Sequence, residues 1–86
     1  MKHFEYAPSP MVCTKKIAFD LDEENRIHNL VFTGGCNGNL QGISALVKGM
    51  TAQDAITRLK GIRCGFKTTS CPDQLAQALE GILANN

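Results

Sequence analysis

The stretch KKIAFDLDEENRIHNLVFT, residues 15–33, decides the fold. In its first part every second residue is large and apolar, which is the period of a strand with one buried face. Ile17, Phe19 and Leu21 form that face. The next five residues, DEENR at 22–26, are a polar segment of the length that joins antiparallel neighbours. We therefore predict that residues 15–33 form a β-hairpin.

The second strand of this hairpin is predicted over residues 27–33, IHNLVFT. Strict alternation places Leu30 and Phe32 on one face. It places Ile27 and Val31 on the other. A further short strand is predicted near the N-terminus, where apolar and polar residues alternate in the sequence FEY before two prolines interrupt the pattern.

Three helices are predicted after the hairpin. Apolar residues recur at helical spacing over 39–48, 51–60 and 72–84, and glycines follow the first two segments. Strands followed by helices indicate an α+β fold, in which the three helices pack on one face of a small antiparallel sheet. The predicted core comprises Leu30, Phe32, Ile43, Val47, Ile56, Leu59, Leu75, Leu79 and Ile82.

Length and charge narrow the class of protein. A chain of 86 residues is expected to form a single domain, residues 1–86, around one core. Nine basic against eight acidic residues give a net charge of +1, which predicts neither nucleic acid nor an anionic membrane as a partner. The N-terminal sequence MKHFEYAPSPM lacks the apolar run of a secretory signal, and no stretch approaches the roughly 20 apolar residues of a membrane span. We expect a cytoplasmic protein.

The four cysteines are Cys13, Cys36, Cys64 and Cys71. A reducing cytosol disfavours a disulfide framework, which leaves metal binding, redox chemistry or plain burial. Cys71 precedes a proline, the residue favoured at the first position of a helix, so Cys71 is expected at or next to a helix N-cap. Cys36 lies a few residues before the first predicted helix. Because a helix N-terminus favours negative charge, both sulfurs are candidates to be thiolates, the form that binds metals.

Three functions remain open on these residues. The first is a metal site, zinc or iron-sulfur, held by Cys13, Cys36, Cys71 and possibly Cys64. The second is thiol-redox or sulfur-handling chemistry, with Cys71 as the reactive thiolate and Cys64 as the resolving thiol. The third is an accessory interaction domain with structural cysteines that binds a partner enzyme or a second copy of itself. The spacing identifies no catalytic residues and contains no C-x-x-C pair.

The histidines and the remaining acid near a helix start carry weaker signals. His28 lies on the hairpin among residues expected to face inward, where a lone histidine is more often a partly buried strand residue than a metal ligand. Asp73 is expected to complement the dipole at the start of the third helix, and it is also placed to orient a ligand there.

Residues 69–73 spell T-S-C-P-D, and this motif resembles the TSCPD-domain family. The segments GGCNGNLQGIS at 34–44 and CGFKTTSCPDQLAQALEGI at 64–82 extend the resemblance along nearly the whole chain. A related domain occurs toward the C-terminus of some adenosylcobalamin-dependent ribonucleotide reductases. The resemblance therefore implies an accessory role related to ribonucleotide reductase.

A more distant resemblance connects the chain with the iron-sulfur cluster assembly scaffold family. Cys13 precedes the hairpin, Cys36 opens a helix and Cys71 opens the last helix, in the same order as the elements of that family. The family holds a nascent cluster or zinc with three cysteines, so the resemblance implies a scaffold-like fold with these three sulfurs on one rim. The chain has Lys15 and Ser70 where that family has an aspartate and a histidine.

Overall fold

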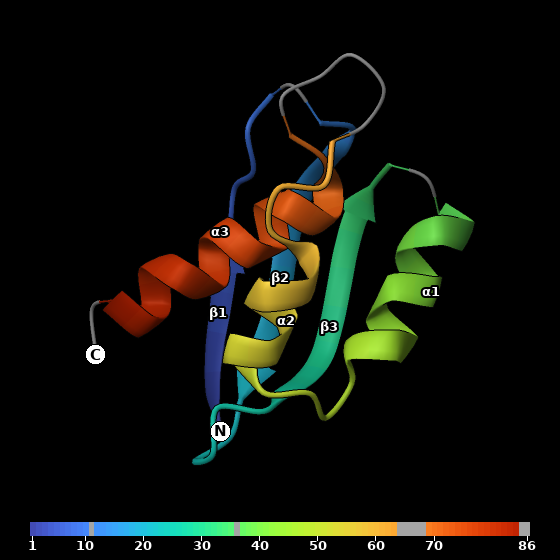
Figure 1. Cartoon of the computed structure of the whole chain (residues 1–86). Helices are drawn as coiled ribbons and strands as arrows, with labels where there is room; N and C mark the ends of the chain where they lie inside the picture. The colour runs from blue at the N-terminus through green and yellow to red at the C-terminus, as the bar shows by residue number, and fades with distance from the viewer. Residues whose placement is uncertain (11, 36, 64–68, 85–86) are drawn as a thin grey trace.

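Three strands form one antiparallel sheet in the computed structural model, which describes residues 1–10, 12–35, 37–63 and 69–84 (Figure 1). The strands are β1 (Lys2–Tyr6), β2 (Thr14–Leu21) and β3 (Ile27–Gly34). Strand β2 lies in the middle and pairs antiparallel with both neighbours. The predicted hairpin is confirmed as β2 and β3, and the short N-terminal strand is β1.

The buried face of the sheet follows the alternation of β2. Ile17, Phe19 and Leu21 are each almost fully buried. Across the strands, Phe4 of β1 pairs with Phe19, with ring centroids 5.7 Å apart. Phe32 of β3 pairs with Ile17 on the other side. Neighbouring large side chains on one face are the contacts that stabilise a sheet, so these pairs fix its register.

Strand β3 departs from strict alternation at Asn29. This residue has a φ of 54°, and the pairing of β3 with β2 shifts by one residue at this point. An extra residue in one strand is a β-bulge, and it reverses which face the following side chains occupy. Ile27 is therefore fully buried in the core, and the prediction that it shares a face with Val31 is wrong. His28 lies on the opposite face from Ile27, so its predicted inward position is wrong, but the prediction that it is a partly buried strand residue is confirmed.

The three predicted helices are all present, with bounds that differ by at most two residues from those predicted. They are α1 (Asn37–Val47), α2 (Ala52–Leu59) and α3 (Cys71–Ala84). Thr51 caps α2, because its Oγ1 accepts a hydrogen bond from the Asp54 backbone nitrogen at 3.2 Å. In the described part of the chain, none of the helices is both long and apolar enough to cross a lipid bilayer.

The helices cover one face of the sheet and leave the other open. Helices α2 and α3 lie across the buried face, and α1 lies alongside β3 (Figure 1). Leu75 and Leu79 of α3 are fully buried, whereas Lys16 and Val31 on the uncovered face are exposed. All nine predicted core residues belong to the resulting hydrophobic cluster or pack against it. The α+β fold is confirmed.

Candidate functional site

Ser70 forms the entrance of α3. Its Oγ accepts a hydrogen bond from the Asp73 backbone nitrogen at 3.2 Å and donates one to the carbonyl oxygen of Ile62 at 2.7 Å. Ser70 is therefore the N-cap, Cys71 the first helical residue and Pro72 the second. The cysteine thus lies next to the N-cap, one of the two positions that the sequence allowed.

Asp73 connects this helix start to the turn after α2. Its carboxylate accepts hydrogen bonds from Thr69 Oγ1 at 2.5 Å, the Gly61 backbone nitrogen at 2.7 Å and Gln77 Nε2 at 2.8 Å. Burial alone raises the pKa of Asp73, but these hydrogen bonds outweigh it and hold the pKa below its ordinary value. The charged carboxylate is committed to three donors of its own chain, so its clear role is in the fold.

Gln74 extends the network to the other side of the helix start. Its Nε2 donates to Thr69 Oγ1 at 2.9 Å, and its Oε1 accepts from the Ser9 backbone nitrogen at 2.9 Å. The Gln74 side chain is nearly fully buried. The segment after β1 is therefore tied to the start of α3 by buried hydrogen bonds, which are costly to break.

Cys71 meets the first residue of β2. Its side chain is only 8% exposed, and Thr14 Oγ1 donates a hydrogen bond to Cys71 Sγ with an oxygen-to-sulfur distance of 2.8 Å. Thr14 is itself buried and directly follows Cys13, which is exposed. The fold thus brings two cysteines from opposite halves of the chain to the end of the sheet where β2 begins.

The end of β3 approaches the same place through Gly35. A Cβ atom on Gly35 would lie 3.0 Å from Thr14 Oγ1, 3.2 Å from Cys13 Sγ and 2.9 Å from Leu40 Cδ1. Gly35 also has a φ of 79°, which glycine adopts without strain. The backbone immediately before Cys36 in the sequence therefore packs against Cys13 and Thr14, at a position that only glycine fits.

Comparison with known proteins places the chain in a family. A family model of the TSCPD domain matches residues 2–83. The chain belongs to the TSCPD-domain family. Neither a search of the curated proteins nor a search of the solved structures found a match. The likeness of this TSCPD domain to iron-sulfur scaffold proteins therefore stays a prediction.

The letters that name the TSCPD domain correspond to residues of the site described above. Thr69 and Asp73 bond to each other, and Ser70 caps the helix. Cys71 accepts the hydrogen bond from β2, and Pro72 occupies an early helical position where its missing N–H costs nothing. Four of the five residues thus have a structural role in this fold, and the cysteine is the one whose side chain is also a reactive group.

The predicted metal ligands are described only in part. Cys36 and Cys64 lie outside the described residues, so the set of Cys13, Cys36, Cys64 and Cys71 stays a prediction. Within the described residues, no three His, Cys, Asp or Glu side chains are grouped so that they could hold a metal ion. The redox alternative expects an exposed Cys71, and the burial of this sulfur does not favour it.

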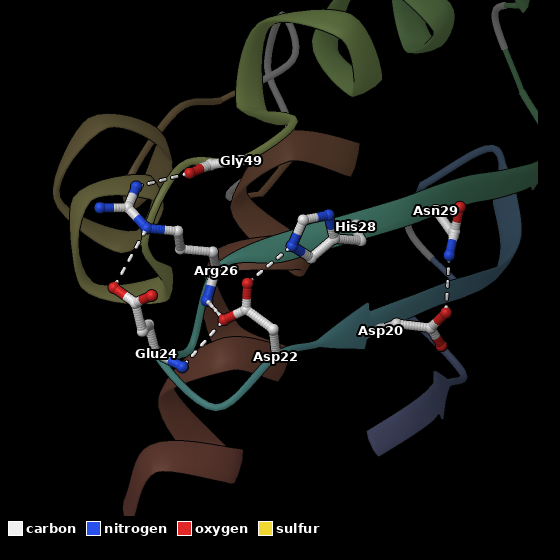
Figure 2. Close-up of polar contacts among 7 residues, drawn as sticks. All are labelled: Asp20, Asp22, Glu24, Arg26, His28, Asn29 and Gly49. Carbon is white, nitrogen blue, oxygen red and sulfur yellow. Dashed lines mark hydrogen bonds and ion pairs between the residues drawn. The ribbon is translucent and has the colours of Figure 1, made fainter. Parts of the chain in front are cut away.

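A second polar cluster holds the turn between β2 and β3, and sequence reasoning identified it only as a polar turn (Figure 2). Asp22 Oδ1 accepts hydrogen bonds from the backbone nitrogens of Arg26 and Glu24, both at 2.9 Å, and Oδ2 is 2.8 Å from His28 Nε2. The hydrogen bond from Arg26, followed by that from His28, lowers the pKa of Asp22. An aspartate that opens a turn is the available signal for this arrangement.

The bulge and β1 are joined on the uncovered face of the sheet. Asn29 Nδ2 donates to Asp20 Oδ2 at 2.8 Å, as Figure 2 shows, and His3 Nδ1 lies 2.7 Å from Asp20 Oδ1. His3 Nε2 lies 3.1 Å from Glu5 Oε2. Asp20 first and then Glu5 raise the pKa of His3. Both histidines of the chain are therefore engaged with carboxylates on the strands and the turn.

Proposed function

We propose that this TSCPD domain binds a metal, zinc or an iron-sulfur cluster, through cysteine thiolates at the end of the sheet where α3 begins. One observation carries the proposal. Cys13 and Cys71 are far apart in sequence, yet both adjoin Thr14, Cys13 as its chain neighbour and Cys71 through the hydrogen bond to its sulfur. Thiolates are the ligands that suit zinc and iron-sulfur clusters.

The remaining ligands of the proposal come from the other two cysteines. Cys36 directly follows Gly35, whose backbone packs against Cys13 and Thr14. Cys64 is the fourth thiol of the chain. Three cysteine ligands leave one position of a tetrahedral metal open to an exchangeable ligand, whereas four close the site and are typical of structural zinc. The contribution of Cys64 therefore distinguishes a transfer site from a structural one.

A metal here would join three segments that lie far apart in the sequence. Cys13 precedes β2, Cys36 lies between β3 and α1, and Cys71 begins α3. Because metal ligands are rarely preorganised in an unfolded chain, the free energy of binding adds to the stability of the folded state. We therefore expect the metal to raise the thermal stability of the domain.

The first test is elemental analysis of protein purified without air, followed by titration with zinc. The wild-type protein should contain or take up zinc or iron. Cys13→Ser, Cys36→Ser and Cys71→Ser should each abolish binding, and Cys64→Ser should weaken it less. Circular dichroism of each variant shows whether it is folded. A folded wild-type protein that neither contains nor takes up metal would overturn the proposal.

The other two functions predict different results in the same experiments. Redox chemistry predicts a metal-free protein in which oxidation joins Cys64 to Cys71. An accessory role, as implied by the related domain of ribonucleotide reductases, predicts that the cysteine variants leave partner binding or self-association intact. Docking on a partner enzyme or on a second copy of the chain stays a prediction.

A further inference from the structure

We infer that Thr14 is a positioning residue for the Cys71 sulfur, and that its hydroxyl makes this sulfur a weaker electron donor to the metal. The inference rests on the proposed metal site and goes beyond it, because it assigns different roles to the two described cysteines. Its basis is the contact of 2.8 Å between Thr14 Oγ1 and Cys71 Sγ.

The branched shape of the Thr14 side chain suits its position, but its buried hydroxyl requires an explanation. Thr14 begins β2 and is 2% exposed, a position for which valine has the same branched shape and the same preference for strands. A buried hydroxyl costs free energy unless it is hydrogen-bonded. The hydrogen bond that satisfies this hydroxyl goes to the Cys71 sulfur. A threonine at this position is therefore matched to the sulfur.

Close packing holds the hydroxyl in place. Thr14 pairs with Gly34 in the ladder between β2 and β3, and the oxygen lies 3.0 Å from the point where a Cβ on Gly35 would be. The side chain of threonine is also stiff about its first torsion, because two heavy atoms branch from its Cβ. The Thr14 hydroxyl is thus held in place by β2 and by the end of β3.

The two described sulfurs consequently have different surroundings. Thr14 has a single hydroxyl hydrogen, and it forms the hydrogen bond to Cys71. Cys71 is buried, whereas Cys13 is exposed. Hydrogen bonds to metal-bound sulfur orient the ligand and withdraw electron density from it, and they are one of the means by which proteins tune such centres. Cys71 is then the ligand with a fixed orientation and a weaker donation to the metal, and Cys13 is the ligand that lies open to solvent.

Cobalt(II) provides the test, because it replaces zinc at thiolate sites and its thiolate-to-cobalt charge-transfer band reports how strongly sulfur donates. Removal of the hydrogen bond leaves a more electron-rich sulfur, so the band of Thr14→Val should move to longer wavelength. Thr14→Ala and Thr14→Ser form a pair that differs by the hydroxyl alone. The alanine variant should shift like the valine variant, and the serine variant should retain the wild-type band.

The outcomes separate this inference from the proposed function. A wild-type protein without any thiolate-to-cobalt band overturns the metal site and the role of Thr14 with it. A wild-type band that is unchanged in both variants that lack the hydroxyl leaves the metal site standing and overturns the role of Thr14. A purely structural role for Thr14 would lower the melting temperature of the variants without moving the band, and that result also overturns the inference.

Discussion

Asp73 shows how one residue can join the start of a helix to the segments around it. It occupies the third position of α3, and three donors from different segments converge on its carboxylate. Asp73→Asn replaces one carboxylate oxygen, which accepts hydrogen bonds, by an NH₂ group, which cannot accept them and faces a donor. We expect it to reduce the free energy of unfolding by about 1.5–3 kcal/mol, the usual value of hydrogen bonds to a buried charge. Urea denaturation measures the change.

A matched control for this substitution exists in α2. Asp54 has the same place relative to its cap, Thr51, but its side chain is exposed. Asp54→Asn removes only the interaction of a surface carboxylate with the helix dipole, which is worth about 0.3–1 kcal/mol. Equal effects of the two substitutions would show that the three hydrogen bonds of Asp73 contribute nothing beyond its charge.

The contribution of Asp73 to stability depends on pH, and the direction of its pKa shift determines how. The folded pKa of Asp73 lies below the ordinary value of 3.8, so the carboxylate contributes its full stability at pH values well above 3.8. This contribution is lost as the pH falls below 3.8 through the folded pKa. Asp73→Asn removes the carboxylate, so the variant has no group that titrates at this position. The difference in stability between wild type and Asp73→Asn should therefore be large at about pH 7 and smaller at about pH 2.5.

At the scale of the elements, β3 shows that the strand propensity of a residue can predict the wrong sign for the effect of a substitution on stability. Valine is favoured in strands over asparagine, so sequence alone predicts that Asn29→Val is stabilising. The bulge holds Asn29 at a φ of 54°, where a β-branched residue is strained. We expect Asn29→Val to destabilise the domain by about 1–3 kcal/mol, as judged by urea denaturation.

Thr33 supplies the control on the same strand. It is exposed in β3, and its φ is not in the left-handed region. Thr33→Val should change stability by no more than about 0.5 kcal/mol. If Asn29→Val were as harmless as Thr33→Val, β3 would have to pair with β2 without the bulge, and Ile27 would then leave the core.

The bulge also marks the limit of what the sequence predicts for this fold. Alternation located β2 correctly, because its buried face has no interruption between Ile17 and Leu21. It failed at Ile27, because one added residue inverts every later assignment. Asn29 carries a weak signal, since asparagine tolerates a positive φ better than most residues, but asparagine is also common in turns.

The candidate site was predictable to a similar degree. The position of Cys71 at a helix start followed from the adjacent proline, and the structure confirms it. The hydrogen bond from Thr14 did not follow from any pattern, because it joins residues at opposite ends of the chain. Such contacts depend on how α3 crosses the sheet, which local sequence does not determine.

At the scale of the whole molecule, α3 connects the core to the site. Its first residue, Cys71, lies against β2, and two turns later Leu79 is fully buried in the cluster formed by the sheet and α2. The network around Asp73 fixes one end of the helix, and the core fixes its middle. The packing that stabilises the domain therefore also holds the Cys71 sulfur beside Thr14.

Truncation of Leu79 tests this coupling of core and site. Leu79→Ala removes buried methyl groups and leaves a cavity, so it should cost about 2–5 kcal/mol in the free energy of unfolding, measured by urea denaturation. Leu46 in α1 is 77% exposed, and Leu46→Ala should change stability by no more than about 0.5 kcal/mol. A small effect at Leu79 would place α3 at the surface. The hydrogen bond between Thr14 and Cys71 would then lack the packing that keeps its partners together.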